Sequence, residues 1–186
     1  EVGEEGRLPV FDAQEAASLL DDQRVRLYLA EMLASFTRVE TVTLVFRGRR
    51  GLVRRHFSEL NVDDLLALSQ LVGESHRYSF FKRVADVCLF LTGMFPEHLV
   101  GWAGGAAAGA RRDSRTLGDY EVLGKEFYQK AAELEERSRG QWAVVLRLLA
   151  EAFTLARKPL NLIALRYIPQ QRRQWFHPGL SSSASL

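Results

Sequence analysis

Residues 75–99 read SHRYSFFKRVADVCLFLTGMFPEHL, and this stretch decides the fold. Between residues 84 and 91 nearly every side chain is apolar, so a helix here is apolar around its whole circumference. Such a helix must be covered by other elements on several sides. We therefore predict an all-α, multi-helix bundle with this helix at its centre and with Pro96 ending it. Its early turns carry polar positions that we expect to face solvent: Ser79, Lys82, Arg83 and Asp86.

The composition is that of a globular domain: of 186 residues, 47% are hydrophobic and 26% are charged. These values and this length predict a single soluble domain. The one cysteine, Cys88, lies inside the apolar run, and we interpret it as a small buried hydrophobe in a reducing compartment. No stretch reaches the roughly 18 uninterrupted apolar residues that a membrane span needs. We therefore expect a cytoplasmic protein that does not cross a membrane.

The sequence pattern divides the chain into a polar N-terminal arm (residues 1–10), a helical domain (11–168) and a C-terminal tail (169–186). Pro159 is expected to break a helix or to begin a short final one at 160–168. Residues 41–57 are open to two interpretations, a short β-hairpin or a helix extension followed by a loop. Outside these segments, apolar residues three and four positions apart predict helices at 11–20, 23–36, 61–73, 117–138 and 141–157.

Two segments carry a resemblance to known sequences, FKRVADVCLFLTGMFPEHL (residues 81–99) and GDYEVLGKEFYQKAA (118–132). Together they resemble a group of uncharacterised bacterial all-helical proteins, which share an LFLSGFFPE-like turn followed by a YYxxxGxxAY-like helix. The resemblance covers about a quarter of the chain and brings no activity with it. It implies that residues 95–97 and the second segment belong to one structural unit.

The second segment also offers a packing site and a candidate pocket. Gly124 falls on the same helical side as Tyr120 and Phe127, which favours close approach of a neighbouring helix at the glycine. The functional alternative is a small-molecule or enzymatic pocket formed by polar groups beside an aromatic wall. Because no nucleophile stands beside a base, we favour packing over catalysis. The candidate pocket residues are Asp119, Tyr120, Lys125 and Tyr128.

A basic cluster is the sharper binding candidate, because no acidic residue occurs between Glu40 and Glu59. Such a cluster attracts phosphate, and it predicts nucleic-acid or anion binding as one function. Arg172 and Arg173, close in sequence to Trp175, Phe176 and His177, would add a basic and aromatic contact of the kind that single-stranded nucleic acids use. The favoured alternative is that these arginines pair with acidic helices of the same chain or of a second copy. The cluster comprises Arg47, Arg49, Arg50, Arg54, Arg55 and His56.

Metal and cofactor chemistry find little support in the sequence. The four histidines are scattered and one cysteine makes no zinc site, so we predict neither a metal nor a cofactor. We predict instead a non-enzymatic helical interaction or regulatory module that acts as a homodimer. The predicted final helix is apolar on too many sides for an ordinary surface element. Its predicted partner interface is Leu162, Ile163 and Tyr167, within a run that also holds Leu160, Leu165 and Ile168.

Overall fold

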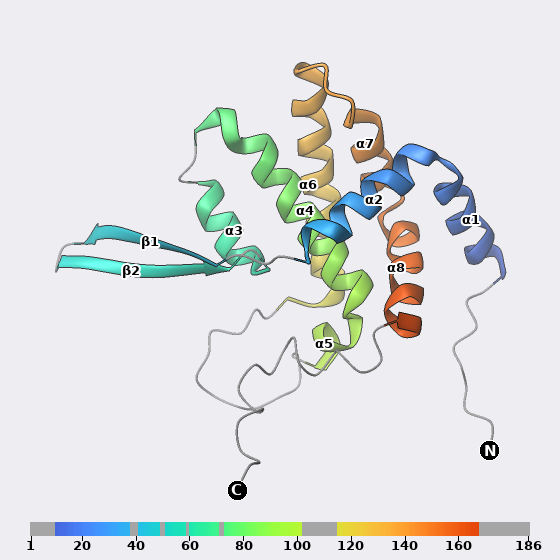
Figure 1. The fold of residues 1–186 in the computed structure, drawn as a ribbon, viewed down its shortest axis with the longest axis horizontal. Coiled ribbons are helices and arrows are strands. Elements are labelled where there is room, and N and C mark those ends of the chain that lie inside the picture. The colour runs from blue at the N-terminus through green and yellow to red at the C-terminus, as the bar shows by residue number, and fades with distance from the viewer. Residues whose placement is uncertain are drawn as a thin grey trace, which may run out of the picture.

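The chain folds as an all-α bundle to which one β-hairpin is attached, as a computed structural model shows (Figure 1). The structure describes residues 10–37, 41–48, 51–58, 60–70, 73–101 and 115–167. The elements in chain order are α1 (Val10–Asp21), α2 (Gln23–Ser35), β1 (Thr41–Gly48), β2 (Gly51–Ser58), α3 (Val62–Ser69), the short 3-10 helix η1 (Glu74–His76), α4 (Arg77–Met94), α5 (Pro96–Gly101), α6 (Leu117–Arg137), α7 (Ala143–Glu151) and α8 (Phe153–Tyr167).

Helix α4 is the centre of the bundle, as its sequence predicts. Every residue from Val84 to Met94 is buried, including Cys88. Helix α6 makes the most extensive contact with α4, and α8 and α3 cover further parts of its surface. Figure 1 shows α4 running through the middle of the bundle, with α2 crossing it. An apolar circumference thus finds apolar neighbours on several sides, which is the condition for burying it.

Side-chain caps fix where the neighbouring helices begin. The Asn61 side chain accepts hydrogen bonds from the backbone N–H groups of Asp63 and Asp64, at 2.9 and 3.2 Å, and so begins α3. Helix α6 begins with a capping box between Thr116 and Asp119. These side chains satisfy N–H groups that the first helical turn leaves without partners.

The predicted break at Pro159 is wrong, because the helix is interrupted earlier. Helix α7 ends at Glu151, Ala152 forms the turn, and α8 then continues through Pro159. A proline inside a helix removes one backbone hydrogen bond and crowds the preceding turn. Packing compensates for this cost, because Phe153 and Leu160, which lie on either side of Pro159 in α8, are both buried. Tertiary contacts therefore override the local preference of proline.

The hairpin interpretation of residues 41–57 is the one that the structure adopts. Strands β1 and β2 are antiparallel, in a register that places Thr41 opposite Ser58 and Gly48 opposite Gly51. Figure 1 shows the two-stranded ribbon extending away from the helices. It meets the bundle where β2 contacts α3. The hairpin is thus an appendage of the bundle.

Several sequence predictions fall outside the described residues. They include the N-terminal arm up to residue 9 and the tail beyond Tyr167, with Arg172, Arg173 and Trp175. Arg49 and Arg50 lie between the two strands, also outside the described ranges.

Candidate interaction surfaces and the buried polar cluster

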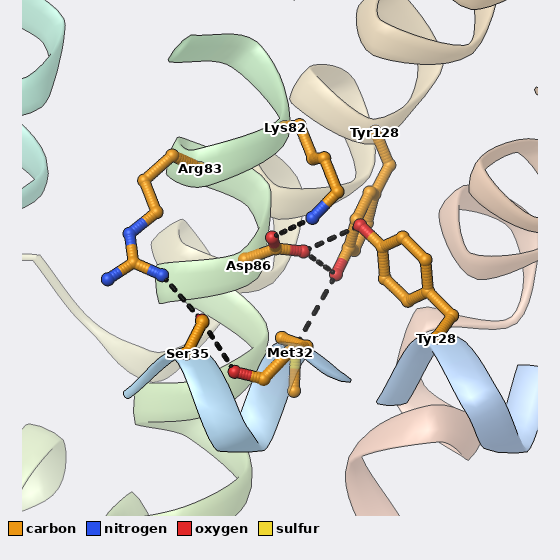
Figure 2. Close-up of polar contacts among 7 residues, drawn as sticks. All are labelled: Tyr28, Met32, Ser35, Lys82, Arg83, Asp86 and Tyr128. Carbon is orange, nitrogen blue, oxygen red and sulfur yellow. Dashed lines mark hydrogen bonds and ion pairs between the residues drawn. The ribbon is translucent and has the colours of Figure 1, made fainter. Parts of the chain in front are cut away.

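Asp86 is buried, and its predicted place on a solvent-facing stripe is wrong. Only 2% of its surface is exposed. The Tyr28 and Tyr128 hydroxyls both donate to its Oδ1, at 2.7 and 2.9 Å, and the Lys82 ammonium donates to Oδ2 at 2.7 Å. Figure 2 shows these four side chains converging from α2, α4 and α6. Both carboxylate oxygens therefore have donors, which offsets the cost of burying the charge.

Aromatic rings enclose this carboxylate. The Tyr28 ring lies edge-on to the Tyr128 ring at 6.2 Å between centroids and to Trp142 at 5.4 Å. The Lys82 ammonium also lies 4.7 Å from the Tyr28 ring centroid. Burial raises the pKa of both tyrosines well above the usual phenol value, and the negative charge of Asp86 raises it further. Both hydroxyls therefore remain protonated donors, and the cluster ties three helices together.

The signal for this cluster was present in the sequence but spread over three segments. Lys82 and Asp86 are four residues apart, a spacing that brings side chains together on a helix. Tyr28 and Tyr128 lie far away in the sequence, and only the packing of α2 and α6 on α4 brings them to Asp86.

The four candidate pocket residues on α6 make contacts of different kinds. Asp119 caps the helix, and hydrogen bonds from the backbone N–H and hydroxyl of Thr116 lower its pKa. Tyr120 is buried, and Tyr128 is bound to Asp86. Lys125 donates to Glu121 at 2.8 Å. The structure therefore does not draw these side chains together around one centre, and the pocket hypothesis stays a prediction.

Glu121 organises a polar seam between α6 and α8. Its carboxylate accepts from Lys125 and from the Thr154 hydroxyl, at 2.8 and 2.5 Å, and lies 3.6 Å from the Arg157 guanidinium. Burial alone would raise the pKa of Glu121, but the hydrogen bonds from Lys125 and Thr154 outweigh it and the pKa is lowered. This seam accounts for the position of Lys125 without a ligand.

The C-terminal half of α8 presents aliphatic side chains to solvent. Leu162 is 50% exposed, Ile163 37% and Leu165 67%. On the other side of the same helix, Leu160 and Ala164 are buried. We call Leu162, Ile163 and Leu165 the α8 patch. The side chain of Tyr167, the third predicted interface residue, lies outside the described set.

The hairpin places part of the basic cluster on its two strands. In the register, Arg47 is opposite Leu52, Arg54 opposite Val45 and Arg55 opposite Leu44. Antiparallel pairing thus brings arginines that are seven and eight residues apart in sequence onto neighbouring strands.

A surface groove lies where α1 packs against the junction of α7 and α8. It has a volume of about 600 Å³, and its lining combines aliphatic residues with polar and acidic ones. Its lining residues are Gln14, Glu15, Ser18, Leu19, Asp22, Leu148, Ala152 and Leu155. The Asp22 carboxylate is engaged by the backbone and guanidinium of Arg24. The groove depends on how three helices pack, so sequence reasoning gave no sign of it.

The described residues contain neither a membrane-spanning helix nor a group of side chains that could hold a metal ion. No helix among them has the length and apolar character needed to cross a membrane. Within the same ranges, no three His, Cys, Asp or Glu side chains are grouped so that they could hold a metal ion. No family model, curated protein or solved structure matches the chain.

Proposed function

We propose that this chain is a non-enzymatic helical interaction module that acts as a homodimer in the cytoplasm. The observation that carries this proposal is the α8 patch, three exposed aliphatic side chains on a helix whose opposite side is part of the core. The polar side chains described above support a non-enzymatic role, because Asp86, Asp119 and Glu121 are engaged in capping and packing.

The α8 patch is suited to bind a partner because the helix that carries it is anchored. Phe153, Ala156 and Leu160 are fully buried, so α8 presents the patch without needing to become ordered first. Leu162 and Leu165 are three positions apart and therefore lie side by side on one face. Covering an aliphatic side chain that is half exposed contributes roughly 1 kcal/mol, and a symmetric dimer gains this for both copies.

The test is the oligomeric state of a patch variant. We expect Leu162→Glu combined with Leu165→Glu to convert a dimer into a monomer in sedimentation velocity, because each dimer would have to bury four unpaired carboxylates. The matched control is Leu27→Glu with Val144→Glu, two substitutions at positions 51% and 59% exposed on α2 and α7. The control should remain a dimer and keep the circular dichroism spectrum of the parent. A monomeric parent, or a patch variant that stays dimeric, would contradict the proposal.

A further inference from the structure

The hairpin is a basic ribbon that extends from a helical body. Its two eight-residue strands contain Arg47, Arg54 and Arg55, and no acidic residue occurs between Glu40 and Glu59. Figure 1 shows the ribbon pointing away from the bundle. Strand β2 reaches the bundle at α3, and β1 pairs with β2. An isolated two-stranded hairpin is marginal in water, so a ribbon of this kind is expected to gain stability from a binding partner.

The register sorts the ribbon positions into two unlike faces. Residues opposite each other share a face, and successive residues alternate between faces. Arg47 and Arg54 therefore share one face, as diagonal neighbours about 7–8 Å apart at their Cα positions. The other positions on that face are mainly polar: Thr41, Thr43, His56 and Ser58, with Val45 and Leu52. Phe46, Phe57 and Arg55 are placed on the opposite face, with most of the aliphatic residues.

We propose that the β1–β2 hairpin is an arm that binds the phosphate backbone of duplex DNA through Arg47 and Arg54 on one face and Arg55 on the other. Arginine is suited to phosphate because its planar guanidinium donates in a fork. Gly48 and Gly51 are paired at the end of the ribbon. Because glycine has no side chain, the DNA backbone can come close to the protein backbone there. The site rests on the hairpin alone and is independent of the α8 patch.

A duplex fits this ribbon better than a single strand. A two-stranded ribbon is narrow enough to enter the major groove, which is about 12 Å wide. Its strands rise about 3.4 Å per residue, so eight residues reach about 27 Å, far enough to contact several phosphates. Single-strand binding needs aromatic rings on the surface that also carries the charge. Here the register separates Phe46 and Phe57 from Arg47 and Arg54, and of the three arginines only Arg55 shares a face with these rings.

The experiment measures binding of the full chain to a fluorescein-labelled duplex of two helical turns, by anisotropy at several salt concentrations. We expect Arg47→Gln, Arg54→Gln and Arg55→Gln together to raise Kd by about tenfold or more. The slope of log Kd against log salt should also fall by about one for each arginine that no longer neutralises a phosphate. Replacing the same three residues by lysine keeps the charge but loses the fork, so it should keep the salt slope of the parent and raise Kd less than the glutamine variant does.

The matched control removes the same charge from the helical body, with Arg77→Gln, Lys130→Gln and Arg137→Gln. These side chains are exposed on α4 and α6. If this control raises Kd as much as the hairpin variant does, binding follows net charge and the proposed site is overturned. Failure of the parent to bind the duplex, or tighter binding of the same strand in single-stranded form, overturns it as well. Circular dichroism and sedimentation of each variant separate loss of binding from loss of folding or of the dimer.

Discussion

Asp86 shows how one buried charge can specify the arrangement of a helical core. An isolated carboxylate costs several kcal/mol to remove from water, and donors must offset that cost. Tyr28 and Tyr128 supply these donors from α2 and α6, and Lys82 supplies one from α4 itself. Any alternative packing that moved either helix would leave the carboxylate or a phenol without a partner. We infer that this cluster selects one packing of the three helices.

Replacing Asp86 tests this role. Asp86→Ala should lower the free energy of unfolding by about 2–4 kcal/mol, because it leaves two buried hydroxyls without an acceptor and Lys82 without its counter-ion. Urea denaturation followed by circular dichroism measures the change. Asp119→Ala removes an exposed capping carboxylate and serves as comparison, with a smaller expected loss. Equal losses for the two variants would mean that the buried cluster contributes no more than a helix cap.

The tyrosines of the cluster also predict a dependence of stability on alkaline pH. The pKa of Tyr28 and of Tyr128 is raised in the folded chain, so the unfolded chain loses these protons first, near the ordinary value of about 10. Their stabilising effect is therefore complete below about pH 10 and is lost as the pH rises further. Each tyrosine contributes a slope of up to about 1.4 kcal/mol per pH unit.

Urea denaturation from neutral pH to about pH 11 measures this slope. Tyr28→Phe with Tyr128→Phe should show a shallower alkaline decline than the parent, even though the variant begins less stable. Parallel curves for the two proteins would show that these phenols titrate alike in the folded and unfolded states.

At the scale of elements, helices α4, α6 and α8 approach one another closely at Gly124. A Cβ at Gly124 of α6 would overlap the Phe153 ring of α8 and come within 3.0 Å of the Cys88 Cβ of α4. The sequence predicted this packing role from the position of Gly124 beside Tyr120 and Phe127. Helix periodicity likewise predicted α4 and α6 well. It missed the turn at Ala152, because Pro159 is the stronger local signal for a helix break. The burial of Phe153 and Leu160, which comes from tertiary packing, explains why α8 continues past Pro159.

Gly124→Ala should destabilise the protein by about 1–3 kcal/mol, because the added methyl group forces the Phe153 ring or a helix to move. The sign of the change in the free energy of unfolding is informative, since alanine in an open helix position stabilises by up to about 1 kcal/mol relative to glycine. Gly118→Ala in the first turn of α6 is the control. The nearest atom to its new Cβ would be the Thr116 hydroxyl at 3.7 Å, so thermal denaturation should show little change or a small gain. A Gly124→Ala protein as stable as the Gly118→Ala protein would refute the close approach.

At the scale of the whole molecule, the two candidate surfaces differ in how far the sequence revealed them. Two residues of the α8 patch, Leu162 and Ile163, were predicted as a partner interface because they belong to a run too apolar for a surface helix, and both are exposed. The basic residues were equally visible, but the extension of the hairpin from the bundle was not, because it depends on where α3 holds the base of β2. The groove beside α1 needed the packing of three helices and left no sequence pattern.

The arrangement of body and hairpin predicts that they can be separated. Among the side chains that the structure describes, those of the core around α4 come from the helices and the turns next to them, and β2 meets the bundle at α3. Replacing residues 41–58 with a short Gly-Ser linker should therefore change the free energy of unfolding by less than about 2 kcal/mol, since loop length alone has a weak effect on stability. Thermal denaturation measures this, and sedimentation should show the oligomeric state of the parent, because the α8 patch is intact. If replacing the hairpin abolishes cooperative unfolding, the prediction is wrong. The hairpin is then an integral part of the bundle, and the helices cover its apolar face.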